Sequence, residues 1–151
     1  MVVLISDNFA EKEKLKKDKI FVLLYFIGIK MKKVKYILNE VGERPWGMWK
    51  CIYVGDKYIS KIITVNPHSS LSLQLHNFRK EHWVVIKGNP VVTLGNVKKE
   101  YSFGQSIDIP VKTKHRLENL TDDFVEILEI QIGDVLDEND IIRFEDIYNR
   151  I

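Results

Sequence analysis

The side chains best suited to chemistry in this sequence gather in one run near its centre. Ser72, Gln74 and His76 occupy alternate positions, so on a β-strand they would share one face. Glu81 follows five residues after His76, which leaves enough chain to turn and return a carboxylate to the same side. His115, far downstream, adds a second imidazole. Imidazole, carboxylate and amide donors together suit a divalent metal with open positions for substrate oxygens.

Residues that offer such donors are Gln74, His76, Glu81, His115 and Asn119. The single cysteine, Cys51, excludes a cysteine-based zinc site and an internal disulfide. Zinc, manganese, cobalt, iron and magnesium all remain open as the metal, because these donors do not select one of them. A lone cysteine also fits a reducing compartment, and we expect a cytoplasmic protein.

These side chains need a polar lumen on one side of their strand and a cover over the leucines on the other. From residue 34 onward, short β-branched and aromatic runs alternate with Gly, Pro, Asn and Asp, which predicts an all-β sandwich or barrel. The expected strands are Tyr58–Val65, Leu71–His76, His82–Ile86, Pro90–Leu94, Ser106–Ile109, Arg116–Asn119 and Phe124–Gln131. Because exposed apolar faces mark interfaces, the leucine face predicts a homodimer.

Two runs interrupt the β pattern. Residues 9–30 read as a helix, so we assign residues 1–33 to an N-terminal appendage and residues 34–151 to the barrel domain. Met31 offers a second start site. Residues 137–150 carry acids early and an arginine late, which favours a short closing helix. The apolar run Ile20–Ile29 is about half the length that spans a bilayer, so we expect no membrane anchor.

The charge balance is ordinary for a single soluble domain. The 151 residues carry 23 Lys and Arg against 21 Asp and Glu, a formal net charge of +2. A charge this small does not indicate a nucleic-acid partner.

The spacing of the chemical residues resembles the cupin superfamily. Its first motif, Gly-x5-His-x-His-x3–4-Glu-x6-Gly, corresponds here to Gln74, His76, Glu81 and Gly88, with glutamine at the first histidine. His68 stands at the opening glycine. The resemblance implies a double-stranded β-helix, or jelly-roll barrel.

The second cupin motif, Gly-x5-Pro-x-Gly-x2-His-x3-Asn, is also present in the right order. Gly104, Pro110, His115 and Asn119 fill its positions, while Lys112 replaces the middle glycine. Side chains at glycine positions are strained wherever the turn needs a positive φ.

Further segments resemble the type II mannose-6-phosphate isomerase domain, which in bifunctional proteins follows a mannose-1-phosphate guanylyltransferase domain. The resemblance covers about residues 41–150 and implies conversion of mannose 6-phosphate to fructose 6-phosphate by metal-assisted proton transfer between C1 and C2. The segments are Arg44-Pro45-Trp46-Gly47, Leu71-Ser72-Leu73-Gln74-Leu75-His76, Arg79-x-Glu81-His82-Trp83, Ile109-Pro110, His115-Arg116-Leu117-Glu118-Asn119, Glu129-x-Gln131-x-Gly133 and Asp140-Ile141-Ile142-Arg143-Phe144-Glu145-Asp146.

The same resemblance implies that the expected metal ligands are Gln74, His76, Glu81 and His115, and it suggests further roles. Arg79 is a candidate cation near the enediolate. From the residues alone, His82, Lys87 and Glu118 stay open for proton transfer, although strand alternation turns His82 away from Glu81. A sugar phosphate would need guanidinium and hydroxyl contacts. The candidates for these contacts are Ser72, Arg44, Arg143 and Arg150.

Two other readings stay open. One is a non-catalytic cupin that binds a sugar or sugar phosphate, and the other is a different metal-dependent cupin enzyme, such as an epimerase or a dioxygenase. Phe78 stands where the isomerases usually carry a second histidine, and this departure favours the non-catalytic reading.

Overall fold

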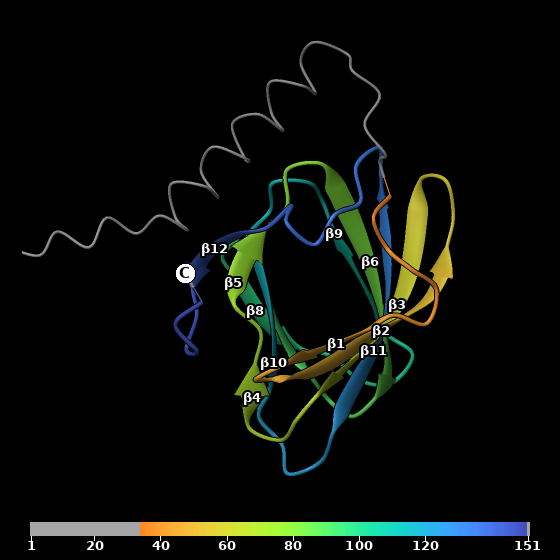
Figure 1. Ribbon diagram of the computed structural model, residues 1–151. Helices are drawn as coiled ribbons and strands as arrows, with labels where there is room; N and C mark the ends of the chain where they lie inside the picture. Colours follow the sequence, from red (N-terminus) through yellow and green to blue (C-terminus); the bar gives the residue numbers. More distant parts are fainter. Residues whose placement is uncertain (1–33, 151) are drawn as a thin grey trace, which may run out of the picture. The chain divides into compact units, whose positions relative to one another are not determined.

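The computed structural model describes residues 34–150, which form strands and loops without a helix (Figure 1). The expected helix at residues 9–30 and the appendage 1–33 lie outside the described residues. The strands are β1 (Val41–Arg44), β2 (Gly47–Val54), β3 (Tyr58–Val65), β4 (Ser69–Ser70), β5 (Leu73–Leu75), β6 (Arg79–Lys87), β7 (Val91–Leu94), β8 (Val97–Glu100), β9 (Ser106–Ile109), β10 (His115–Asn119), β11 (Val125–Gly133) and β12 (Ile142–Glu145).

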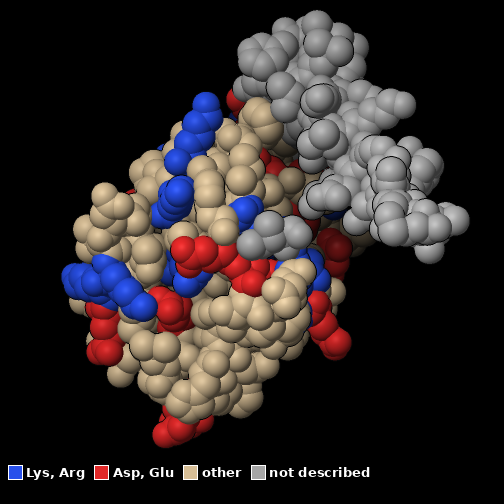
Figure 2. All heavy atoms as spheres, turned by 90° about the vertical axis from the view of Figure 1, so that its left-hand side faces the viewer, with Lys and Arg blue, Asp and Glu red and all other residues tan. Residues whose placement is uncertain are grey.

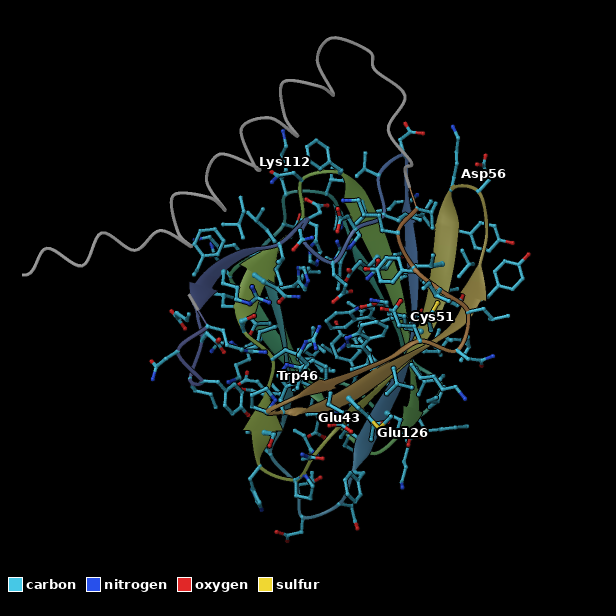
Figure 3. The ribbon with its side chains drawn as sticks, in the orientation of Figure 1. Glu43, Trp46, Cys51, Asp56, Lys112 and Glu126 are labelled. Carbon is cyan, nitrogen blue, oxygen red and sulfur yellow. The ribbon has the colours of Figure 1, made fainter. Side chains whose placement is uncertain are left out.

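The strands form two antiparallel sheets that face each other across a shared interior (Figures 1 and 3). The first sheet has the order β1-β2-β3-β11-β6-β9, and the second has the order β12-β5-β10-β7-β8, with β4 paired to β10. The all-β expectation is therefore met throughout residues 34–150.

The core follows from the alternation along the longest strands. In β11, Val125, Ile127, Glu129 and Gln131 are buried, and the residues between them are partly exposed. Because successive side chains on a strand point to opposite faces, one side of the first sheet supplies the interior. That interior is apolar near Val125 and Ile127 and polar near Glu129 and Gln131.

The closing helix expected at residues 137–150 is wrong. Residues 137–141 form a loop, and β12 follows it as the outer strand of the second sheet, with Ile142 opposite Leu75 and Arg143 opposite Gln74. Pairing with β5 satisfies backbone groups that a helix would have satisfied internally. Tertiary context thus overrode the charge order that favoured a helix.

The motif positions that usually carry glycine all have a left-handed backbone. Gly88 and Gly104 have φ of 74° and 81°, and His68 and Lys112 have φ of 51° and 59°. The turns of the two motifs are therefore kept, although two of them contain side chains that this conformation disfavours.

The surface carries charges of both signs. On the face shown in Figure 2, lysines and arginines lie among aspartates and glutamates, with uncharged residues between them. Within residues 34–150, no helix has the length and apolar character needed to cross a membrane.

Candidate metal centre and substrate cavity

Three of the four expected ligands meet between the two sheets. Glu81 projects inward from β6 of the first sheet, while His115 begins β10 of the second sheet and His76 directly follows β5. One ligand atom from each of these three buried residues lies within 4.8 Å of the other two. A strand turn after His76 thus returns Glu81 to the same interior, as the spacing predicted.

Both imidazoles are oriented by a contact between Nδ1 and a main-chain carbonyl. Nδ1 of His76 lies 2.5 Å from the carbonyl oxygen of Asp140, and Nδ1 of His115 lies 2.9 Å from that of Thr113. A carbonyl only accepts hydrogen bonds, so each Nδ1 carries a proton, and Nε2 is the ring atom left to face a metal. The two Nε2 atoms lie 3.1 Å and 3.7 Å from the carboxylate of Glu81.

Electrostatics keep His115 and Glu81 in their coordinating forms. Burial lowers the pKa of His115 to about 4, so its ring is neutral at neutral pH. Burial opposes ionisation of Glu81, but His76 and Arg79 together hold the pKa of that carboxyl well below its usual range. Nε2 of His115 is buried and has no hydrogen-bond partner. A buried, unpartnered lone pair beside a carboxylate fits a bound divalent cation.

Gln74, the fourth expected ligand, lies on β5 opposite His115 in the strand register. It is buried, and its Oε1 accepts a hydrogen bond from Oγ of Ser72 at 2.8 Å. Gln74 and Glu81 both line one cavity, so the amide and the carboxylate open onto the same space. The residues present can therefore supply two imidazoles, a carboxylate and an amide oxygen to a divalent metal.

The four expected substrate residues line the same cavity: Ser72, Arg44, Arg143 and Arg150. Nε of Arg143 is buried without a hydrogen-bond partner. Burial, and then the charge of Arg150, lowers the pKa of the Arg143 guanidinium, and Arg44 adds to this effect. Asp146 and Glu138 offset part of this effect by pairing with Arg150 and Arg44, whereas Arg143 forms no ion pair of its own within residues 34–150. The arrangement therefore favours an anionic ligand near Arg143.

Of the expected catalytic residues, only Arg79 reaches the cavity. It is buried, its Nε donates to Glu81 at 3.1 Å, and its Nη2 lies 3.2 Å from Nε2 of His76. His82 is turned outward and lies 2.7 Å from Asp108. The alternation of β6 explains this placement, because His82 stands between the buried Glu81 and Trp83.

Glu118 is not brought to the cavity either. Alternation along β10 points His115 and Leu117 inward and Glu118 outward, where its carboxylate pairs with Lys98 at 2.9 Å. Neither His82 nor Glu118 is retained as a candidate for proton transfer.

Sequence reasoning assigned no role to a second polar group in the cavity, which comprises Lys61, Glu129, Gln131 and Glu138. Burial raises the pKa of Glu129 to about 8, and its carboxyl accepts hydrogen bonds from Trp83 and Gln131. Lys61 pairs with Glu138 and lies 4.1 Å from the ring of Tyr36. Lys61 and Glu129 stand at inward positions of β3 and β11, and this pattern could have identified the second polar group from the sequence.

Comparison with known proteins places this site in a family. The sequence matches the family described as "Mannose-6-phosphate isomerase C-terminal" over residues 32–146. The chain belongs to this family. The matched range includes all four expected ligands and Arg143, which confirms the family that the motifs indicated.

Named bacterial proteins are similar to this chain over most of its length. "Xanthan biosynthesis protein XanB" of Xanthomonas campestris is 44% identical over 107 residues, covering 71% of this chain and 23% of that protein. "Mannose-1-phosphate guanylyltransferase ManC" of Salmonella typhimurium is 42% identical over 108 residues, covering 72% and 22% respectively. The chain therefore spans less than a quarter of the length of these relatives.

Solved structures establish the fold of this family member as a cupin. A barrel domain protein from Salinispora arenicola, titled "Cupin 2 conserved barrel domain protein", matches with a TM-score of 0.52 and 16% identity, covering 56% of this chain and 74% of that one. Oxalate decarboxylase from Lactobacillus farciminis matches with a TM-score of 0.60 and 18% identity, covering 70% and 33%. At these identities the likeness shows the fold alone.

Proposed function

We propose that this chain is a metal-dependent isomerase that interconverts mannose 6-phosphate and fructose 6-phosphate. The observation that carries the proposal is a buried His-Glu-His cluster whose Glu81 lines a cavity that arginines also line. A bound divalent metal would be held by Gln74, His76, Glu81 and His115, and it would supply Lewis-acid stabilisation of negative charge on the sugar oxygens. The net reaction moves one proton between C2 and C1 and one between their oxygens.

The arginines at the cavity suit the phosphate of this substrate. Arg44, Arg143 and Arg150 line it together, and Ser72 adds a hydroxyl close to Gln74. Guanidinium groups bind phosphate through paired hydrogen bonds, and a dianion would relieve the repulsion among the three cations.

Two residues that line the cavity are our candidates to act on the sugar. Arg79 holds a positive charge beside Glu81, where negative charge would develop on the sugar oxygens. Glu129 lines the cavity and is neither an expected ligand nor the partner of Lys61, which pairs with Glu138. We therefore assign the transfer of the proton between C1 and C2 to Glu129, in place of His82 and Glu118.

The proposal also covers the oligomeric state and the location of the protein. We infer a homodimer, because Ile142 and Phe144 on β12 are exposed beside the partly exposed Leu73 and Leu75 of β5. The mass in solution tests this inference. We also infer a cytoplasmic location. Guanylyl transfer, which the name of one relative states, is not proposed for this chain.

The test is a coupled assay of mannose 6-phosphate turnover by the metal-stripped protein, before and after addition of Zn²⁺, Mn²⁺ or Co²⁺. We expect turnover only with metal, and a loss of at least about 100-fold in Gln74→Ala and His115→Ala. His82→Ala is the matched control, because this histidine faces outward, and it should keep its activity. Absence of turnover with every metal, while mannose 6-phosphate still binds, would favour the non-catalytic cupin.

A further inference from the structure

Asp140 lies in the loop between β11 and β12 and is buried despite its charge. Its carboxylate accepts backbone hydrogen bonds from the two residues that directly follow His76: Asn77 at 2.9 Å and Phe78 at 3.1 Å. Its own carbonyl accepts from Nδ1 of His76 at 2.5 Å. One residue thus holds both the imidazole of a metal ligand and the main chain next to it.

Asp140 also reaches a second ligand through Arg79. Nη1 of Arg79 donates to the carbonyl of Asp140 at 3.0 Å and to that of Asp137 at 2.9 Å. Nε of the same side chain donates to Glu81 at 3.1 Å. The loop therefore orients His76 directly and Glu81 through one guanidinium group.

The side chain of Asp140 can fix the position of the main-chain carbonyl of Asp140, because both groups belong to the same residue. As long as the carboxylate is fixed to the Asn77–Phe78 turn, the carbonyl stays opposite Nδ1 of His76. Without this anchor the imidazole could take the other tautomer, in which Nε2 carries the proton and cannot bind a metal. Hydrogen bonds of this kind typically change metal affinity by about 10–100-fold.

We propose that Asp140 is a positioning residue that sets the metal affinity of this site by fixing the tautomer of His76. The inference rests on the proposed metal centre. Its test measures binding of the metal alone, so a protein without isomerase activity still tests it.

The experiment compares wild type with Asp140→Asn, which keeps the size of the side chain but loses its charge and one acceptor. Zn²⁺ binding to the stripped protein is measured by calorimetry, and histidine ¹⁵N shifts are recorded without metal, where only four histidines contribute. We expect Kd to rise about 10–100-fold and the His76 signal to lose its Nδ1–H signature, while that of His115 persists.

Asp137→Asn is the matched control. Asp137 is equally buried in the same loop, but its carboxylate bonds to Asn139 and Lys35 rather than to the turn after His76. Its Kd should stay within about threefold of wild type. An unchanged Kd in Asp140→Asn, or an equal rise in Asp137→Asn, overturns the proposal. If Asp140→Asn does not fold, an Nε2–H tautomer of His76 in the wild type would overturn it as well.

Discussion

Arg143 is the cavity residue that most favours an anionic ligand. Its backbone lies on β12, opposite Gln74, and its side chain lines the cavity with Nε buried and unpartnered. Burying a guanidinium group beside other cations costs free energy unless an anion neutralises it. Arg143 is thus the arginine whose contribution to binding should be easiest to measure.

Arg143→Gln should raise KM for mannose 6-phosphate about 10–100-fold, because a hydrogen bond to a charged group contributes about 1.5–3 kcal/mol. Turnover at saturating substrate should change less, since the phosphate lies away from the reacting carbons. Arg116→Gln is the control, because Arg116 pairs with Glu145 and does not line the cavity. Equal effects of both substitutions on KM, measured by steady-state kinetics, would contradict this phosphate site.

At the scale of single elements, the turn before β10 has a strained backbone at Lys112, which a glycine would relieve. Lys112 has φ of 59°, and its backbone N–H donates to the carbonyl of His76 at 2.7 Å. The turn therefore contacts the main chain of a metal ligand, and this contact depends on the backbone and not on the lysine side chain.

Lys112→Gly should stabilise the protein. A left-handed non-glycine residue costs about 1–2 kcal/mol, and added freedom of glycine in the unfolded chain offsets about 0.5–1 kcal/mol of that. We expect a net gain of about 0.5–1 kcal/mol and a Tm about 2–5 °C higher, measured by thermal denaturation. Lys114→Gly, in the same loop but without a positive φ, should instead lower Tm. A lower Tm in Lys112→Gly would show that no strain is stored there.

The elements also show where sequence reasoning succeeds. The bounds of β3 and β9 were predicted correctly, because both runs are rich in β-branched residues and are bounded by turn residues. The period-2 alternation of Ser72, Gln74 and His76 likewise predicted that these three side chains share one face, and all three are buried. The strand β12 was missed because its short run has no partner that the sequence alone can identify, and pairing with β5 decides its structure.

The charged interior was harder to foresee. Lys61 and Glu129 lie directly opposite each other on β3 and β11, but this register becomes visible only when the sheet is formed. A lysine or glutamate in a strand is read as solvent-exposed by default, because such residues are rarely buried without a partner. Here the partners come from distant segments, so the cavity combines residues whose association no local pattern predicts.

At the scale of the whole molecule, the candidate metal centre draws its side chains from both sheets. Glu81 comes from β6 in the first sheet, whereas Gln74 and His115 come from β5 and β10 in the second. A cation bound to all of them would be bound only by the folded barrel, since the unfolded chain does not hold these side chains together. Metal binding should therefore stabilise the fold as a whole.

Removing the metal should lower Tm. At free metal about 100 times its Kd, binding contributes about 2.7 kcal/mol, which corresponds to roughly 10 °C in a domain of this size. Thermal denaturation with Zn²⁺ and with excess chelator measures this difference. The Tm difference between metal and chelator should be small in His115→Ala and unchanged in His82→Ala, because His115 faces Glu81 and His82 does not. An equal Tm shift in wild type and His115→Ala would mean that the cation binds elsewhere. It would contradict the proposal that one cation binds side chains from both sheets.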